Sequence, residues 1–304
     1  MRKTTLFLTA GATLTLSLAA CSSTSSSSST APAAAQQGGN LTIAIDSYPQ
    51  DINPYSPTID PQSLEVYDSW FQYLVEPSAN GSTFVPTLAT KYQVSADKKT
   101  YTFTLRAGVK FSNGSTMTAG DVIYSLQQAF FQKGSQINFL APKISSITSP
   151  DASTVVVKLK SPWPYLLADL SGFNAPILPA SLVKSEGLPA FLKHQIGTGP
   201  FVMTSAVPGS SLTVTRNKYY WQPGLPHLNS ITFKVIGSDV GRAAAVEAGQ
   251  ADVAADPPLN QVPALRQNNS VRVLEFPAAQ LISVIINTQQ APVNNVKVRE
   301  AIGA

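Results

Sequence analysis

The stretch that decides the fold runs from Lys99 to Gly114 and reads Lys-Thr-Tyr-Thr-Phe-Thr-Leu-Arg-Ala-Gly-Val-Lys-Phe-Ser-Asn-Gly. Polar and apolar residues alternate from Tyr101 to Leu105, which predicts a strand with one face in a core. Asn113-Gly114 is a pair that favours a tight hairpin turn. Thr118 and Asp121 then have the spacing of a helix N-terminal capping pair, so we expect a helix to begin there.

Strands and helices are predicted along the whole chain outward from this stretch. Strands are expected at residues 41–45, 109–111, 153–160, 212–216, 231–236, 271–276 and 281–286. Helices are expected at residues 64–75, 118–131 and 240–248, and from residue 296 onward. The mixture predicts an α/β or α+β fold without internal repeats.

The N-terminus has the pattern of an export signal. Arg2 and Lys3 precede an apolar stretch from Leu6 to about Leu18, which is too short to span a bilayer. The segment Leu18-Ala-Ala-Cys21 resembles the lipobox of bacterial lipoproteins, in which the cysteine carries lipid. We therefore expect a signal peptide at residues 1–20, palmitate or a related lipid on Cys21, and a location outside the cytoplasmic membrane.

Residues 21–39 are rich in Ser, Thr, Ala, Gln and Gly and carry no charge, which predicts a flexible tether. About 265 residues remain for one large domain or two modest ones. The formal net charge is +4, and its Lys and Arg residues are spread along the sequence. This pattern argues against a nucleic-acid partner, which needs a basic stripe.

Catalytic and metal-binding signals are weak. Ser95-Ala-Asp-Lys98 and Ser181-Leu-Val-Lys184 satisfy a Ser-x-x-Lys pattern, but no Gly-x-Ser-x-Gly elbow accompanies them. The two histidines, His194 and His227, lack ligand spacing, and Cys21 is the only cysteine. We expect a protein that is not an enzyme and that has no cofactor and no metal.

Three groups of motifs together resemble the family 5 solute-binding proteins of ATP-binding-cassette importers, which bind peptides or nickel. The segments that carry the resemblance are 88–94 with 99–125, then Gly197-Thr-Gly-Pro-Phe201 with Arg216-Asn-Lys-Tyr-Tyr-Trp221, and finally Asn287-Thr-Gln-Gln-Ala-Pro292 with Lys297-Val-Arg-Glu-Ala-Ile302. These motifs occur in the order and with the spacing that the family has, and they follow a lipobox. The resemblance covers essentially all of residues 40 to 304. From the residues themselves we expect Gly197 and Gly199 to permit a tight backbone path, and Asp121 to cap a helix. Tyr220 and Trp221 are expected to bury their rings within the lobe instead of contacting a ligand.

The resemblance implies a two-lobed clamp whose ligand lies between the lobes. It places lobe I at residues 40–70 and 180–276, an inserted subdomain at 71–179, and the start of lobe II at 277–304. Members of the family extend well beyond this point, so we expect the second lobe to be mostly absent from the 304 residues.

The same resemblance implies a set of ligand-binding residues. Alignment of Asn53-Pro54 with a similar dipeptide of the family puts the contacts at Pro57, Thr58, Ile59 and Asp60. Tyr48 and Gln280 are weaker candidates. Ordinary loop packing is the competing interpretation for each residue, and for Thr58 and Asp60 the two interpretations have about equal weight.

The function that the resemblance implies is the capture of di- to oligopeptides by a monomeric lipoprotein, followed by delivery to the permease subunits of the importer. Two alternatives stay open. One is a remnant that binds nothing or only interacts with other proteins. The other is a carrier of a nickel chelate or another small solute.

Overall fold

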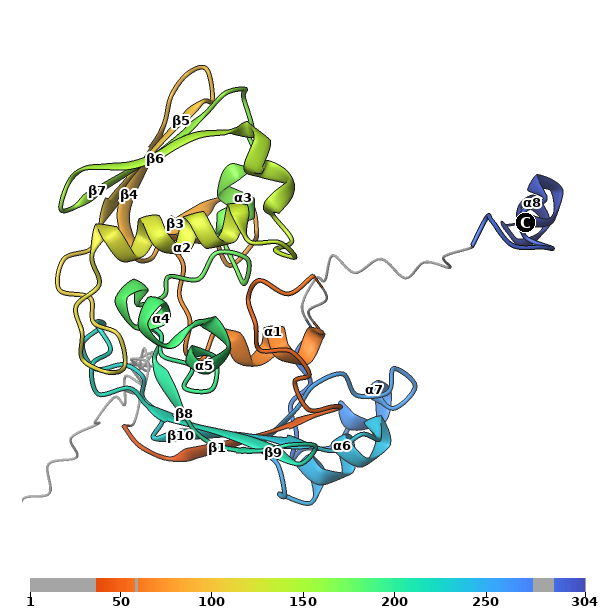
Figure 1. Cartoon of the computed structure of the whole chain (residues 1–304). Helices are drawn as coiled ribbons and strands as arrows, with labels where there is room; N and C mark the ends of the chain where they lie inside the picture. The colour runs from red at the N-terminus through yellow and green to blue at the C-terminus, as the bar shows by residue number, and fades with distance from the viewer. Residues whose placement is uncertain (1–36, 58–59, 276–286, 304) are drawn as a thin grey trace, which may run out of the picture. The chain divides into compact units, whose positions relative to one another are not determined.

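The computed structural model describes residues 37–57, 60–275 and 287–303 (Figure 1). These residues belong to one unit. Within the described part, none of the helices has the length and apolar character that crossing a membrane requires. Cys21, Thr58, Ile59, Gln280 and the predicted strand at 281–286 lie outside the described residues.

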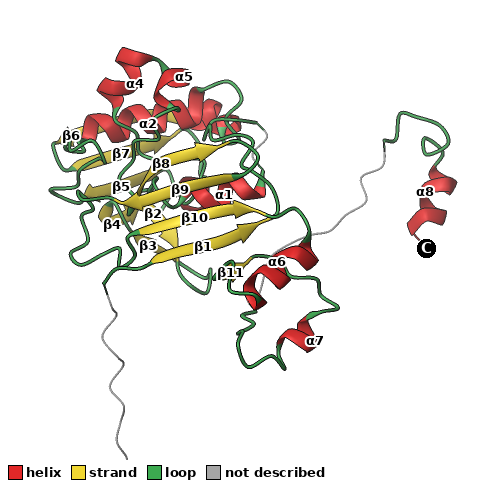
Figure 2. Ribbon diagram, turned by 90° about the horizontal axis from the view of Figure 1, so that it is seen from below, coloured by secondary structure: helices red, strands yellow, loops and turns green. Residues whose placement is uncertain are grey.

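A five-stranded sheet is built from segments far apart in the sequence, and Figure 2 shows β8, β9, β10 and β1 side by side. Its strands are, in spatial order, β11 (Val253–Ala254), β1 (Asn40–Ile45), β10 (Ser230–Val235), β9 (Ser211–Arg216) and β8 (Phe201–Val207). β1 runs parallel to both of its neighbours, whereas β10, β9 and β8 pair in antiparallel fashion. The parallel pairs require long connections, which the rest of the chain supplies.

A second, antiparallel sheet contains the alternating stretch from Tyr101 to Leu105 as one of its central strands. Its strands are, in spatial order, β4 (Ala89–Val94), β5 (Thr100–Leu105), β7 (Thr154–Leu159) and β6 (Ile144–Asp151). Residues of β5 alternate between half-buried and buried, as the sequence pattern predicts. A short hairpin of β2 (Val75–Pro77) and β3 (Phe84–Pro86) accompanies it.

Helix α2 (Ala119–Phe131) packs against β6 and β7 (Figure 1). Its N-terminus is a complete capping box: Thr118 accepts a hydrogen bond from the Asp121 N–H, and the Asp121 carboxylate accepts one from the Thr118 N–H. The second carboxylate oxygen of Asp121 accepts a hydrogen bond from Ala180 N at 2.8 Å. The predicted capping role of Asp121 is therefore observed, and the same residue ties α2 to a distant segment.

The remaining helices are shorter. They are α1 (Pro61–Tyr67), the 3₁₀ helix η1 (Asn138–Lys143), α3 (Leu166–Leu170), α4 (Ala180–Glu186), α5 (Leu188–Phe191), α6 (Asp239–Glu247), α7 (Val262–Leu265) and α8 (Val296–Gly303). Gly249 follows α6 with φ +68°, a left-handed conformation that glycine adopts easily.

The Gly197–Pro200 segment passes directly over the backbone of residues 69–71. A Cβ on Gly197 would lie 1.9 Å from Trp70 O, and one on Gly199 would lie 2.6 Å from Trp70 C. Gly199 N donates to Trp70 O at 3.0 Å. Trp70 itself is fully buried in the main core. Glycine is required here because no side chain fits between the two backbones.

Three predicted elements differ from the structure. The strand expected at 109–111 is absent, because the chain turns after Phe111, where Gly114 N donates to Phe111 O at 2.8 Å, and Lys110 forms only an isolated bridge with Thr116. The helix expected at 64–75 is α1, which begins at Pro61 and ends at Tyr67. It ends early because the carbonyls of Ser69 and Trp70 accept hydrogen bonds from the segment after Gly197 instead of from their own helix. Residues 271–275 form no strand, so that part of the predicted strand at 271–276 is wrong.

Candidate functional site

Among the predicted ligand-binding residues that the structure describes, Asp60 has the most side-chain hydrogen bonds. Its Oδ1 accepts a hydrogen bond from Ser63 N at 2.8 Å, which caps helix α1. Its Oδ2 accepts hydrogen bonds from Ser63 Oγ at 2.6 Å, Gln50 N at 3.1 Å and Asp51 N at 3.3 Å. The carboxylate therefore joins the start of α1 to the loop that follows β1.

The protonation of Asp60 follows from these contacts. Burial acts to raise the pKa of its carboxyl, but the hydrogen bonds from Ser63, Gln50 and Asp51 outweigh burial and lower the pKa below its usual value. Asp60 is consequently a carboxylate at neutral pH. A ligand that approached it would meet a negative charge already held in place.

The loop between β1 and α1 is held by its own short polar side chains. Asp51 Oδ1 accepts from Asn53 N at 2.9 Å, and Asn53 Oδ1 accepts from Tyr55 N at 3.0 Å. Such turns fix an irregular backbone without a strand or a helix. Tyr55 is buried in the main core, which anchors the far end of this loop.

Tyr48 and Pro57 flank this ordered region. Tyr48 is half-buried and packs against the main core, and burial raises the pKa of its hydroxyl. Pro57 is exposed and lies close to Gly134. A Cβ added to Gly134 would lie 3.4 Å from Pro57 Cδ. The structure thus places Tyr48, Pro57 and Asp60 on the segment between β1 and α1, as their closeness in the sequence requires. Their contacts with a ligand stay a prediction.

A pocket of about 510 Å³ lies away from that loop. It is lined by Asp68, Phe71, Gln72, Tyr73, Glu76, Pro77, Ser171, Gly172, Pro200 and Tyr220. The Tyr73 hydroxyl donates to Asp68 Oδ1 at 3.1 Å. Burial raises the pKa of Glu76, and the nearby Asp68 charge raises it further. None of these residues is predictable as a binding-site residue from sequence, because the segments that line the pocket are separated by about a hundred residues.

Trp221 lies beside this pocket in a polar network. Its Nε1 donates to Gln72 Oε1 at 2.9 Å, and the Arg106 guanidinium stacks 4.0 Å above its ring. The Gln72 amide also lies 3.3 Å from the Tyr220 hydroxyl. Trp221 thus has the packing role that the sequence suggested, whereas Tyr220 also faces the pocket.

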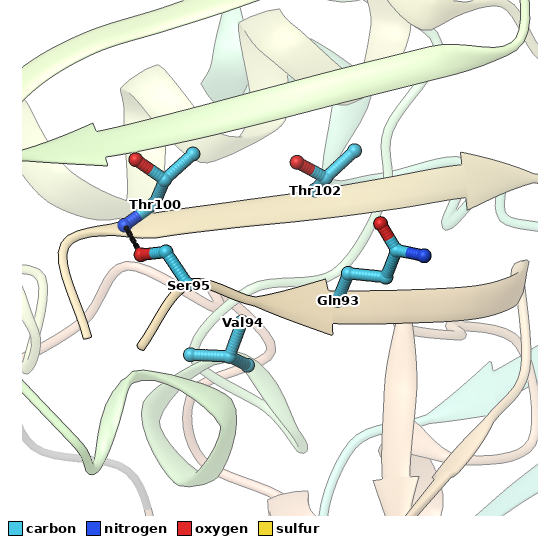
Figure 3. A pocket seen from close by; sticks show the side chains of 5 residues that line it. All are labelled: Gln93, Val94, Ser95, Thr100 and Thr102. Atoms are coloured by element: carbon cyan, nitrogen blue, oxygen red, sulfur yellow. Dashed lines mark hydrogen bonds between the residues drawn. The ribbon is translucent and has the colours of Figure 1, made fainter. Parts of the chain in front are cut away.

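A second, more open pocket of about 440 Å³ lies on the four-stranded sheet. Gln93, Val94, Ser95, Thr100 and Thr102 line it (Figure 3). Thr100 N donates to Ser95 Oγ at 2.9 Å, so the loop between β4 and β5 closes on itself at the pocket edge. Neither pocket contains Tyr48, Pro57 or Asp60.

Metal binding has no geometric support in the part of the chain that the structure describes, where no group of three His, Cys, Asp or Glu residues is placed to hold an ion. His194 Nε2 lies 3.7 Å from Glu186 Oε2. His227 Nδ1 lies 2.7 Å from Gln37 Nε2. Each histidine therefore has a different neighbour, and the two do not form a common site.

Sequence profiles define the class of protein. The profile of bacterial extracellular solute-binding proteins, family 5 Middle, matches residues 83–304. The chain belongs to this family, which is a family of transport proteins located outside the cytoplasm. The resemblance seen in the sequence motifs is thereby confirmed.

Individual relatives agree with the profile. The chain is 28% identical over 283 residues to the probable D,D-dipeptide-binding periplasmic protein DdpA of Escherichia coli K12, covering 86% of this chain and 54% of that protein. It is 31% identical over 265 residues to the glutathione-binding protein GsiB of the same strain, covering 86% of this chain and 51% of GsiB. The chain thus spans about half the length of the curated relatives it matches.

Solved structures show the same fold. MoaA of A. tumefaciens R10, in complex with mannopinic acid, matches with a TM-score of 0.79 at 29% identity over 88% of this chain and 55% of MoaA. HbpA2 of Haemophilus parasuis matches with a TM-score of 0.72 at 26% identity over 87% of this chain and 56% of HbpA2. The mixed α/β fold of a periplasmic binding protein is therefore confirmed.

Proposed function

We propose that this protein captures peptides outside the cytoplasmic membrane and delivers them to the permease subunits of an ABC importer. The observation that carries the proposal is the family match over residues 83–304, together with relatives named for binding a D,D-dipeptide and glutathione. Both of those named ligands are small peptides, so peptides are the substrate class that these relatives support.

In this proposal the five-stranded sheet belongs to lobe I and the four-stranded sheet to the subdomain inserted into it. Lobe I comprises residues 40–70 and 180–276, the insertion comprises 71–179, and 277–304 begin lobe II. The ligand would contact the loop after β1 through Pro57, Thr58, Ile59 and Asp60, with Tyr48 and Gln280 nearby. The bonded carboxylate of Asp60 supports this proposal, because a preordered charge costs less to engage than a mobile one.

Binding in such a protein requires no chemical step. A ligand enclosed between two lobes exchanges water for hydrogen bonds in a medium of lower dielectric, where each bond is stronger. Closure is a hinge motion that the permease would recognise. The energy for transport would come from the ATPase subunits of the importer.

Attachment to the membrane is the second part of the proposal. Leu18-Ala-Ala-Cys21 supports lipidation of Cys21, and residues 21–39 would form the tether. Several acyl chains on one cysteine give stable anchoring, whereas one chain gives only reversible binding. The proposed product is a monomeric lipoprotein on the outer face of the cytoplasmic membrane.

The proposal is tested by protein NMR of the 304-residue chain with glutathione, D-Ala-D-Ala and a set of di- to tetrapeptides. Peptide capture predicts that peptides shift signals of residues 46–60, even at affinities as weak as about millimolar. A single amino acid and a sugar serve as controls.

Two alternatives give different results in the same experiment. A carrier of another small solute predicts shifts at residues 46–60 with a nickel chelate or with mannopinic acid, and none with peptides. A remnant without binding function predicts no shift with any of these compounds. Either result would overturn peptide capture.

A further inference from the structure

One end of the four-stranded sheet combines basic and aromatic side chains, and we call it the lysine–aromatic end. Its lysines are Lys98, Lys99, Lys143, Lys158 and Lys160, and its aromatic residues are Phe139, Trp163 and Tyr165. The residues come from the β4–β5 loop, η1, the last residues of β7 and the segment that follows β7.

Backbone contacts bring these separate segments together. Trp163 N donates to Lys98 O at 3.3 Å, and Lys160 N donates to Lys143 O at 2.8 Å. Lys158 pairs with Thr100 across β7 and β5. Lysines that are scattered in the sequence therefore meet at one place in the fold.

The three aromatic rings form a chain across this end. Ring centroids are 6.0 Å apart for Phe139 and Trp163, and 5.6 Å apart for Trp163 and Tyr165, both edge to face. Phe139 is 52% exposed and Tyr165 is 65% exposed. Lys143 Nζ lies 5.1 Å from the Trp163 ring centroid. Exposed rings that contact one another, unlike singly exposed apolar residues, indicate a candidate interaction surface.

The charge of this end is only partly offset by its own acidic residues. Asp97 accepts hydrogen bonds from Ser95 Oγ and Lys99 N, and Asp169 Oδ2 accepts one from Trp163 Nε1 at 2.7 Å. Among the described residues, none of the five lysines has an ion-pair partner within 4.0 Å. Five lysines thus face two aspartates in a chain whose formal net charge is only +4.

The open pocket of Figure 3 belongs to the same end of the sheet. Thr100 lines the pocket and is the cross-strand partner of Lys158. The other lining residues include Gln93, Ser95 and Thr102, whose hydroxyl and amide groups can hydrogen-bond a polar headgroup.

We propose that the lysine–aromatic end rests on the surface of an anionic lipid bilayer. Trp, Tyr and Phe rings favour the boundary between headgroups and acyl chains, because each has a large apolar face and Trp and Tyr also carry a polar tip. Each lysine near an anionic membrane adds attraction that salt weakens. A soluble polyanion would use the lysines but would leave the exposed Phe139 and Tyr165 rings without an apolar partner. The proposal does not depend on peptide capture.

The test uses the full chain carrying Cys21→Ser, so that no acyl chain is attached. Its N-terminal apolar segment is the same in every variant, so differences between variants report on the lysine–aromatic end. The probes are vesicles of phosphatidylcholine alone and of equimolar phosphatidylcholine and phosphatidylglycerol. Sedimentation measures partitioning, and lipids brominated on their acyl chains measure contact with tryptophan. Trp163 is the reporter, because Trp70 is buried and Trp221 lies under Arg106.

We expect Lys98→Gln/Lys143→Gln/Lys160→Gln to lower partitioning onto the anionic vesicles by about tenfold or more. The control Lys133→Gln/Lys193→Gln/Lys234→Gln removes the same charge at exposed sites elsewhere and should change partitioning by no more than about twofold. Phe139→Ser/Tyr165→Ser removes two exposed rings and should also weaken binding to the anionic vesicles. Brominated lipid should quench the parent chain, and Trp163→Phe should remove the quenched fraction.

Three results would overturn the proposal. Equal losses in the two lysine variants would show that only net charge acts. Vesicle binding without quenching of Trp163 would place the contact elsewhere. Loss of heparin binding by the first lysine variant, with unchanged vesicle partitioning, would assign the surface to a soluble polyanion.

Discussion

Replacing Gly197 with alanine measures how much stability depends on the close approach of the Gly197–Pro200 segment to Trp70. The new Cβ would lie 1.9 Å from Trp70 O and 2.9 Å from Phe71 Cδ1. Real Cβ atoms keep at least 3.0 Å from such neighbours, so one backbone must move by more than about 1 Å. Both partners are main chain or buried ring, and neither can rotate away.

The movement would disrupt the two hydrogen bonds that cross this contact and the one that joins Gly197 to Ser112. These are Gly199 N to Trp70 O at 3.0 Å, Phe201 N to Ser69 O at 2.8 Å and Ser112 N to Gly197 O at 2.8 Å. Each contributes about 1 kcal/mol, and more where a buried group is left unpaired. We expect Gly197→Ala to lower the free energy of unfolding by about 3–5 kcal/mol, against a typical total of about 5–15 kcal/mol.

Urea unfolding followed by tryptophan fluorescence would measure this loss, and the melting temperature should fall by about 10 °C. Gly209→Ala is the matched control, because Gly209 has φ +73° and no atom within 4 Å of its missing Cβ. It should cost only about 1–2 kcal/mol, the penalty for a left-handed alanine. The reasoning would be refuted if Gly197→Ala were no more destabilising than Gly209→Ala.

Three further predictions concern a helix cap, a buried acid and the anchor. Thr118→Ala should lower the free energy of unfolding by about 1 kcal/mol, and Asp121→Ala by more, because Asp121 also bonds the start of α4; equal losses in chemical denaturation would contradict this. Burial and the Asp68 charge raise the folded-state pKa of Glu76, so stability should fall as pH rises above about 4, the ordinary glutamate range, and Glu76→Gln should flatten this fall in pH-dependent melting. Cys21→Ser should abolish incorporation of labelled fatty acid, and equal labelling of both proteins would exclude the anchor.

Local signals in the sequence predicted local structure well. Thr118 and Asp121 lie three residues apart, and their hydrogen bonds depend only on the backbone between them, so the start of α2 was predictable. The alternation in β5 likewise reports one buried face of one strand. Such elements need no information about the rest of the fold.

Elements whose limits depend on distant segments were predicted poorly. Helix α1 ends at Tyr67 because Ser69 and Trp70 bond a segment about 130 residues away, and nothing near Tyr67 announces that partner. The lysine–aromatic end also depends on contacts between segments that are distant in the sequence. Lys98, Lys143 and Lys160 are separated in the sequence, but backbone hydrogen bonds bring their segments together. The basic residues are therefore spread along the chain, whereas these three lie close together in the fold.

Asp60 shows how a residue of a binding loop can be placed by sequence while its chemistry depends on structure. A carboxylate offers about four acceptor sites, two on each oxygen, and Asp60 accepts four hydrogen bonds from the residues that the structure describes. Among these, three reach Oδ2, from Ser63 Oγ, Gln50 N and Asp51 N, and one reaches Oδ1, from Ser63 N. A ligand ammonium could therefore bind Oδ1 without breaking the loop, whereas contact through Oδ2 would compete with Gln50 and Asp51. Ligand binding by Asp60 stays a prediction, and we expect it to occur through Oδ1, the oxygen with fewer hydrogen bonds from the described residues.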